Sequence, residues 1–372
     1  MQTCPTFVAR LSSRVFLGPV VARDEEWLPI AVSYTINLMR AARALKQWNY
    51  MLRSIVHWFL PECKDLRAQY KSARKIINQE IERRRQLWEA DKKAGRPVSK
   101  TADSLGWMQE LGHGKNFDLA GGQLALTFAA IHTTSDLITK SMVRLATSPE
   151  IADALRKEMI EVLGNEGMKK TSLYQMKLLD SFLKEVQRLE PAGLSRLLSF
   201  LPCSVSLSRE SFANVLLFSS TIALINRTAD EPVQLQDGNL IPKGAVIRVV
   251  GNKSFDGNVF PDPQKFDPYR FLKLRSQPGQ ENNWQFVTVA PESLGFGLGM
   301  HACPGRFFAS NEVKIALCWL LMKYEWKLED GAVSPGSIEL GFEIMANPMT
   351  KLVYRRRKEE LDMLSLFETY EA

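Results

Sequence analysis

The chain has 372 residues, of which 45% are hydrophobic and 24% are charged, so it is long enough and apolar enough to bury one large core or two smaller ones. This composition excludes a predominantly disordered protein. The net charge of +7 is compatible with a nucleic-acid partner, but the basic residues are scattered over helical faces and are not interleaved with aromatic ones. We therefore expect no nucleic-acid binding; a docking face for an acidic redox protein explains the charge equally well.

Cysteine usage argues against a secreted domain built on disulfides. The chain has five cysteines, an odd number without framework spacing, which favours a reducing compartment. The amino-terminal stretch MQTCPTFVARLSSRVFLG lacks the continuous apolar core of a signal peptide, and no uncharged apolar run is long enough to span a bilayer. From the sequence as written we expect no transmembrane anchor.

The first half of the chain is expected to be helical. Asp24-Glu25-Glu26 predicts a helix start, because acidic side chains stabilise the positive end of the helix dipole, and apolar residues recur at helical spacing to Leu45. A second, highly charged helix is predicted over 61–90. The polar stretch 91–104, with its Gly and Pro, is predicted to be a loop, and a long apolar helix is predicted over 118–146.

The second half mixes helices with short strands. Ser148-Pro149-Glu150 restarts a helix that is predicted to end at Gly164, and a further helix is predicted over 172–189. A hairpin is predicted around Asp237-Gly238-Asn239. A helix over 306–323 and short strands up to Tyr354 complete a chain that is mainly α with small β-sheets, an α+β protein.

The most informative stretch is Phe-Gly-Leu-Gly-Met-His-Ala-Cys-Pro-Gly, residues 296–305, which ends just before the predicted helix at Arg306. The glycines allow backbone to approach a flat cofactor, and amides at a helix start stabilise a negative sulfur. Cys303 is therefore a candidate metal ligand, with haem as the obvious cofactor. The alternative is a buried structural cysteine at a helix start.

This run resembles the haem-binding signature of the cytochrome P-450 family, Phe-x-x-Gly-x-basic-x-Cys-x-Gly, at every defined position: Phe296, Gly299, His301, Cys303 and Gly305. The resemblance implies that Cys303 is the proximal ligand of the haem iron. The electron-rich sulfur of Cys303 would then favour cleavage of a bound O–O bond. It also implies that His301 meets a haem propionate, in a place where Arg is commoner.

Two further motifs resemble elements of the same family. Glu185 and Arg188 lie at i and i+3 on one helical face, where they can pair, and Arg270 follows a proline within Phe-Asp-Pro-Tyr-Arg-Phe. They resemble the family's Glu-x-x-Arg and Pro-x-Arg-Phe elements. The resemblance implies that Glu185, Arg188 and Arg270 join to brace the haem-side core, a structural role.

The long apolar helix contains Ala-Ala-Ile-His-Thr-Thr, residues 129–134, which resembles the family's oxygen-activation motif. On this resemblance Thr133 delivers protons to bound dioxygen. The sequence departs from the pattern because His132 replaces the usual acid and Ala130 the usual glycine. His132 either relays protons with Thr133 or points into a polar niche of the core, and the residues alone leave both roles open.

The resemblance, nearest to fungal-type members that oxidise specialised metabolites, implies insertion of one oxygen atom from O₂ into a lipophilic substrate. Electrons would come from NADPH through a flavoprotein reductase, at the cytosolic face of the endoplasmic reticulum. Apolar residues around Phe128, Ala129 and Ile344-Met345 are candidate substrate contacts. Two alternatives are a catalytically incompetent remnant, and a haem enzyme that rearranges or dehydrates its substrate without external electrons.

The likeness covers nearly the whole chain but begins in what resemble the family's middle helices, so we expect residues 1–372 to form a single haem-thiolate domain that lacks the amino-terminal part. Residues Ser195 to Ala223 are rich in Ser and apolar residues and have no clear period. We expect this stretch to be an intron read through in frame or another gene-model error. The alternative is a genuine insertion that forms a surface flap.

Overall fold

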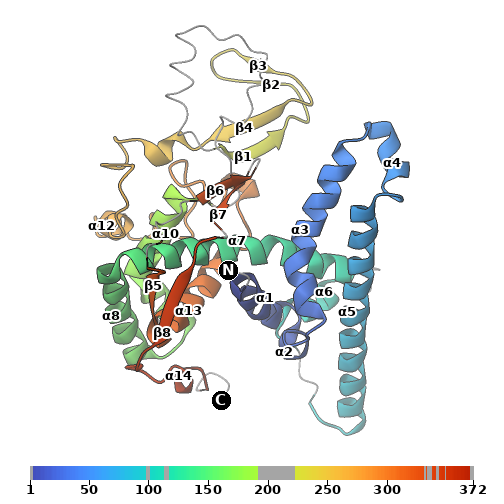
Figure 1. The fold of residues 1–372 in the computed structure, drawn as a ribbon, viewed down its shortest axis with the longest axis horizontal. Coiled ribbons are helices and arrows are strands. Elements are labelled where there is room, and N and C mark those ends of the chain that lie inside the picture. The colour runs from blue at the N-terminus through green and yellow to red at the C-terminus, as the bar shows by residue number, and fades with distance from the viewer. Residues whose placement is uncertain are drawn as a thin grey trace. The chain divides into compact units, whose positions relative to one another are not determined.

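The computed structural model describes residues 3–97, 101–112, 117–191, 223–330, 332, 337–340, 343–347 and 349–368 (Figure 1). The chain divides into two compact units, Met1–Ser135 and Asp136–Ala372. The stretch expected to be anomalous, 195–223, lies outside the described residues except for Ala223, the first residue of a strand.

The described part of the first unit is helical. Its elements are α1 (Thr3–Phe16), α2 (Gly18–Val21), α3 (Trp27–Lys46), η1 (Tyr50–Leu52), α4 (Arg53–Val56), α5 (Pro61–Lys93), α6 (Ser104–Leu111) and the first part of α7 (Leu119–Thr147). The long helices α3 and α5, blue in Figure 1, lie side by side. They are joined by a hydrogen bond of 3.1 Å from Asn37 Nδ2 to Gln69 Oε1.

The predicted helices of this unit are present, with changes at their ends. The Asp24 carboxylate accepts hydrogen bonds from the backbone N–H of Glu26 (2.8 Å) and of Trp27 (2.9 Å), which satisfies amides at the start of α3. The loop predicted over 91–104 is shorter than expected because α5 continues to Lys93. The helix α1 was not predicted.

The described part of the second unit combines helices with four two-stranded antiparallel sheets, which pair β1 with β4, β2 with β3, β5 with β8 and β6 with β7. The mainly α, α+β fold class is thereby confirmed. After the end of α7 its elements are α8 (Pro149–Glu166), α9 (Lys170–Gln175), α10 (Lys177–Leu189), β1 (Ala223–Thr228), β2 (Val233–Gln234), β3 (Leu240–Ile241), β4 (Val246–Val250), η4 (Asn252–Phe255), α12 (Arg270–Arg275), η5 (Gly299–His301), α13 (Arg306–Lys323), β5 (Tyr324–Leu328), β6 (Ser337–Leu340), β7 (Glu343–Ala346), β8 (Leu352–Arg356) and α14 (Ser365–Glu368).

The turn predictions of this unit held in part. The hairpin is confirmed, with Gly238 at φ +88° between β2 and β3. Helix α8 ends at Glu166 and not at Gly164, because the glycine that takes the positive φ of a helix end is Gly167, at φ +71°.

The single helix predicted over 172–189 is wrong, because the chain breaks at Met176 into α9 and α10. The Glu158 carboxylate explains the break. It accepts hydrogen bonds from the backbone N–H of Leu178 (2.6 Å) and of Leu179 (2.9 Å) and so starts α10 anew.

Helix α10 forms the centre of the second unit. Every residue from Leu178 to Arg188 is buried, including the charged ones, and α10 packs against α12. Because buried charges require partners, the segments that α10 touches are held by ionic and hydrogen-bonded contacts as well as by apolar packing.

Candidate functional site

Cys303 lies in a loop that is closed by hydrogen bonds on both sides. The Cys303 loop comprises residues 296–305, with Cys303 between η5 and α13, and the Cys303 thiol is free and half-buried. The Cys303 backbone N–H donates to the carbonyl oxygen of Phe296 (2.7 Å), and Arg306 Nη1 donates to the carbonyl oxygen of Cys303 (2.8 Å). The backbone that carries the thiol is therefore fixed before and after the side chain.

Two glycines allow this loop to fold back on itself. Gly297 and Gly299 have φ of +76° and +65°, values that residues with a Cβ rarely adopt. A Cβ at position 297 would lie 3.2 Å from the carbonyl oxygen of His301, so a side chain there would crowd the loop. Gly305 precedes α13, and a Cβ on it would lie 3.9 Å from Cys303 Sγ.

The side chains around the thiol differ in their exposure to solvent. The half-buried Phe296 ring packs against the buried Phe286 ring, with centroids 5.1 Å apart. His301 is exposed, and so are the apolar side chains of Met300 and Phe307. A charged group at this end of the loop is the Arg306 guanidinium, whose Cζ lies 4.7 Å from the centroid of the Phe307 ring.

Cys318, the second cysteine in the described part of this unit, is a poor ligand. Cys318, in α13, is fully buried, and burial raises the pKa of its thiol to about 12. Since the thiolate is the form that binds metal, Cys318 stays protonated and inert, and its Sγ lies 3.7 Å from Met176 Sδ. Of the two, Cys303 has the setting of a ligand.

The donor set matches a haem. Among the described residues no group of three or more His, Cys, Asp and Glu side chains is placed to hold a metal ion. A single thiolate would suffice as the protein's ligand to haem iron, because the porphyrin would supply nitrogen ligands of its own. The residues around Cys303 therefore fit this cofactor.

The three residues of the expected brace come together. The Glu185 side chain, which has no exposed surface, accepts from Arg188 Nε and Nη2 (2.8 Å each) and from Arg270 Nε (3.0 Å). It also accepts from the backbone N–H of Asp267 (3.1 Å). One carboxylate thus binds two buried guanidinium groups through charge-assisted hydrogen bonds. These bonds compensate for removing the three charges from water.

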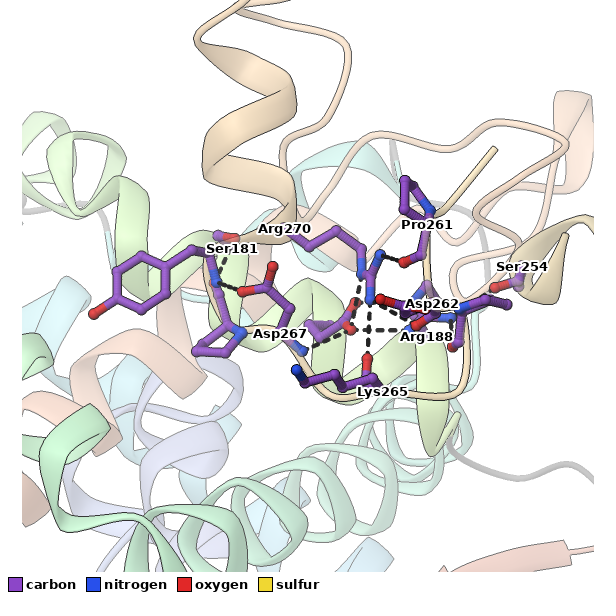
Figure 2. Close-up of polar contacts among 12 residues, drawn as sticks. Ser181, Arg188, Ser254, Pro261, Asp262, Lys265, Asp267 and Arg270 are labelled. Carbon is purple, nitrogen blue, oxygen red and sulfur yellow. Dashed lines mark hydrogen bonds and ion pairs between the residues drawn. The ribbon is translucent and has the colours of Figure 1, made fainter. Parts of the chain in front are cut away.

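The two arginines use their remaining N–H groups on backbone carbonyls, as Figure 2 shows around Arg188 and Arg270. Arg188 Nη1 donates to Ser254 O (2.8 Å) and Pro263 O (2.7 Å). Arg270 donates to the carbonyl oxygens of Pro261, Asp262 and Lys265 at 2.6, 3.2 and 2.9 Å. The irregular segment 254–265 is therefore tied to α10.

Helix α10 also meets the chain just ahead of the Cys303 loop. A Cβ on Gly295 would lie 2.3 Å from Gln187 Cδ, so only glycine permits this approach. The buried charges of α10 and the thiol loop thus belong to one packed body in the second unit.

The helix α7 carries Thr133 and His132 in the first unit. Thr133 is exposed, and its hydroxyl donates to the carbonyl oxygen of Ala129 (2.8 Å), one turn earlier. His132 Nε2 lies 2.9 Å from the carbonyl oxygen of Val32 in α3. Because a carbonyl oxygen can only accept a hydrogen bond, Nε2 carries the ring proton, and this hydrogen bond ties α7 to α3.

The candidate substrate contacts are only partly described. Phe128 is half-buried and Ala129 is exposed, both on α7. Ile344 and Met345 belong to β7, but their side chains lie outside the described residues.

Sequence reasoning overlooked a second set of buried charges on α10. Asp180 accepts from Arg275 Nη1 (3.0 Å), Lys314 Nζ (2.6 Å) and the backbone N–H of Phe286 (2.8 Å). Lys184, one position before Glu185, is 1% exposed. The signal was the spacing of Asp180 and Lys184, two opposite charges four residues apart on one helix.

The comparisons with known proteins give the chain its family. The sequence model described as "Cytochrome P450" matches residues 20–206 and 216–351. The chain belongs to the cytochrome P450 family. The recognition drawn from its motifs is thereby confirmed.

Relatives within the cytochrome P450 family include fungal monooxygenases. The chain is 42% identical over 356 residues to cytochrome P450 monooxygenase adrA of Penicillium rubens, covering 95% of this chain and 64% of that protein. It is 38% identical to cytochrome P450 monooxygenase pyr3 of Aspergillus fumigatus, covering 97% and 64%. The chain thus spans just under two thirds of the length of these relatives.

A solved structure confirms the P450 fold. The chain matches a cyanobacterial protein, CYP120A1, solved with retinoic acid bound, at a TM-score of 0.65 and 18% identity; the match covers 96% of this chain and 69% of that one. In the described part of this P450 chain, none of the helices is long and apolar enough to cross a membrane.

Proposed function

We propose that this chain forms a haem-thiolate monooxygenase domain in which the Cys303 thiolate would hold the haem iron. The observation that carries the proposal is the free, half-buried Cys303 thiol in a loop closed by its own backbone and by Arg306. When bound, the haem supplies reductive activation of O₂. The overall reaction inserts one oxygen atom into a C–H bond and releases the other as water, with a pair of electrons from NADPH.

The loop residues have separate tasks in this proposal. Gly297 and Gly299 supply the positive φ angles of the loop, Gly305 leaves space beside the sulfur, and Phe296 holds the loop on the core through Phe286. The exposed His301 is assigned to a haem propionate, to which a protonated ring would donate. Glu185, Arg188 and Arg270 are assigned a structural role, supported by the carbonyl groups that both arginines hold.

Proton delivery is assigned to Thr133. Its hydroxyl donates to a carbonyl of its own helix, and its oxygen can accept a hydrogen bond from water. For His132 we take the structural alternative, because its Nε2 proton is used on the Val32 carbonyl. The apolar Phe128 and Ala129, with Ile344 and Met345, are proposed as substrate contacts.

The substrate and partners follow from the family. We propose a lipophilic specialised metabolite as substrate and an NADPH-dependent flavoprotein reductase as electron donor, at the cytosolic face of the endoplasmic reticulum. The names of the fungal relatives, all monooxygenases, support oxygen insertion over the alternative of rearrangement without external electrons.

The test is an absorption spectrum of the chain expressed with haem, reduced with dithionite and exposed to carbon monoxide. The strongly red-shifted Soret band of a thiolate–haem–CO complex is expected in the natural chain and in Cys318→Ala, and is expected to be lost in Cys303→Ala. Absence of the band from the natural chain would refute the proposal and favour the incompetent remnant. Retention in Cys303→Ala would refute the ligand assignment.

A further inference from the structure

A buried lysine of α10 holds a turn that comes just before the Cys303 loop. Lys184 Nζ donates to the carbonyl oxygens of Gln285 and Thr288, at 2.9 Å each. The same Gln285 carbonyl accepts the backbone N–H of Thr288 at 3.0 Å, so the two oxygens belong to one tight turn. The lysine therefore spans both ends of this turn.

The surroundings of Lys184 make this an unusual use of a charge. The side chain is 1% exposed, and the carbonyl oxygens of Gln285 and Thr288 that accept its hydrogen bonds are neutral. Its Nζ lies 5.4 Å from the centroid of the Phe271 ring in α12. The charged groups that face it are Asp180 on its own helix and Arg275 on α12. Burial lowers the pKa of Lys184 to about 7, with Arg275 adding to the effect and Asp180 opposing it.

The turn is connected to the thiol loop through one aromatic contact. Phe286 lies inside the turn; its backbone N–H donates to Asp180 Oδ2 (2.8 Å), and its ring is fully buried. That ring packs against Phe296, whose carbonyl oxygen accepts the backbone N–H of Cys303 (2.7 Å). Asp180 therefore holds Phe286 itself, and Lys184 holds the residues at the two ends of the turn that carries Phe286.

We propose that Lys184 is a positioning residue for Cys303: by clamping the Gln285–Thr288 turn it seats Phe286 under Phe296 and so holds the loop that presents the thiol. That the positioned thiol serves as a ligand rests on the proposed function. That Lys184 holds the Cys303 loop in place does not, because the contacts from Lys184 to Cys303 involve protein atoms alone.

The test compares Lys184→Met with Lys177→Met. The first change keeps the length and apolar stem of the side chain but removes its donors, and the second removes an exposed lysine from the same helix. In the full chain, hydrogen exchange of a peptide that contains Cys303 is measured by mass spectrometry and compared with peptides of α8. Because hydrogen bonds from a charged group are lost, exchange at Cys303 is expected to be about tenfold faster in Lys184→Met, with α8 unchanged. Lys177→Met is expected to match the natural chain.

A second variant covers the case in which Lys184→Met does not fold. Phe286→Leu leaves every charge in place and removes the ring that packs against Phe296, and it is expected to accelerate exchange at Cys303 in the same way. The proposal is overturned if either folded variant leaves exchange at Cys303 unchanged, or if exchange rises equally in α8, since that pattern reports general loss of stability.

The spectrum separates this proposal from the proposed function. In haem-loaded chain, Lys184→Met is expected to lower the fraction of haem that shows the thiolate band, relative to Lys177→Met. If the natural chain shows no thiolate band, the proposed function fails while the exchange comparison still decides the role of Lys184.

Discussion

Removing the charge of Glu185 should destabilise the second unit far more than removing the charge of an exposed carboxylate. In Glu185→Gln the shape of the side chain is kept, but an NH₂ group replaces one of the oxygens that face Arg188 and Arg270. Those guanidinium groups are 3% and 8% exposed, so solvent cannot take over the lost interaction. An N–H group would then face an N–H group inside the core.

The magnitude follows from the burial of all three partners. Breaking a buried ion pair by neutralising one member costs about 3–5 kcal/mol, because a buried charge is left without compensation. Whole domains are stable by only about 5–15 kcal/mol, so the variant should lose a large share of its free energy of unfolding. The carbonyl partners of Arg188 and Arg270 keep the loss from being larger.

The matched control is Glu360→Gln. Glu360 also pairs with an arginine three residues away, Arg357, through two hydrogen bonds of 2.8 and 2.6 Å, but its side chain is 41% exposed. Solvent screening limits such a pair to about 1 kcal/mol or less. Urea unfolding followed by tryptophan fluorescence gives both free energies. Equal unfolding midpoints for the two variants would refute the reasoning that burial makes the brace strong.

Three further predictions concern the thiol loop, the buried lysine and α7. Gly279→Ala should lower the free energy of unfolding by about 1 kcal/mol because of its positive φ alone. Gly297→Ala should lower it more and reduce the thiolate band, because its Cβ would also meet a carbonyl oxygen at 3.2 Å. Equal losses of stability in thermal unfolding would contradict this. The pKa of Lys184 is about 7 in the folded chain and 10.5 in the reference state, so the unfolded chain binds more protons between these two pH values. The free energy of unfolding should therefore rise with pH across this window. The slope should exceed that of Lys184→Met by about 1.4 kcal/mol per pH unit. Urea titrations with parallel pH dependence would contradict that linkage. Thr133→Ala should lower oxygenated product at least about 100-fold, while Thr147→Ala, which removes the same kind of exposed hydroxyl bonded back to its own helix, should not; product assayed with a lipophilic substrate found by screening checks this.

Local patterns predicted most of the helices because each is encoded by residues close in the sequence. The start of α3 follows from Asp24, and α13 begins and ends where the apolar period and Gly305 indicate. The break between α9 and α10 was missed because its cause, Glu158, lies on another helix. A capping carboxylate about twenty residues away leaves no local signature.

The candidate site was predictable where a motif is short and not where contacts are distant. The spacing of Glu185 and Arg188 indicates a pair by itself, but the contact with Arg270 came from family resemblance, since 85 residues separate the partners. Lys184 was overlooked because a lysine on a helix is normally solvated. The contact between the His132 ring and the Val32 carbonyl oxygen could not be predicted either, because 100 residues separate the two.

The buried charges of α10 also constrain the order in which the chain can fold as it is synthesised. Apart from Arg188 on the same helix, the partners of Glu185 lie 82 and 85 residues further along. The three partners of Asp180 lie 95, 106 and 134 residues further along. The ribosome thus completes α10 long before these partners emerge, and a helix with unpaired charges cannot be buried early. The second unit must therefore assemble late, around α10, after α13 has been made, and a translation product that stops before Lys314 has no means of burying Asp180 in this way.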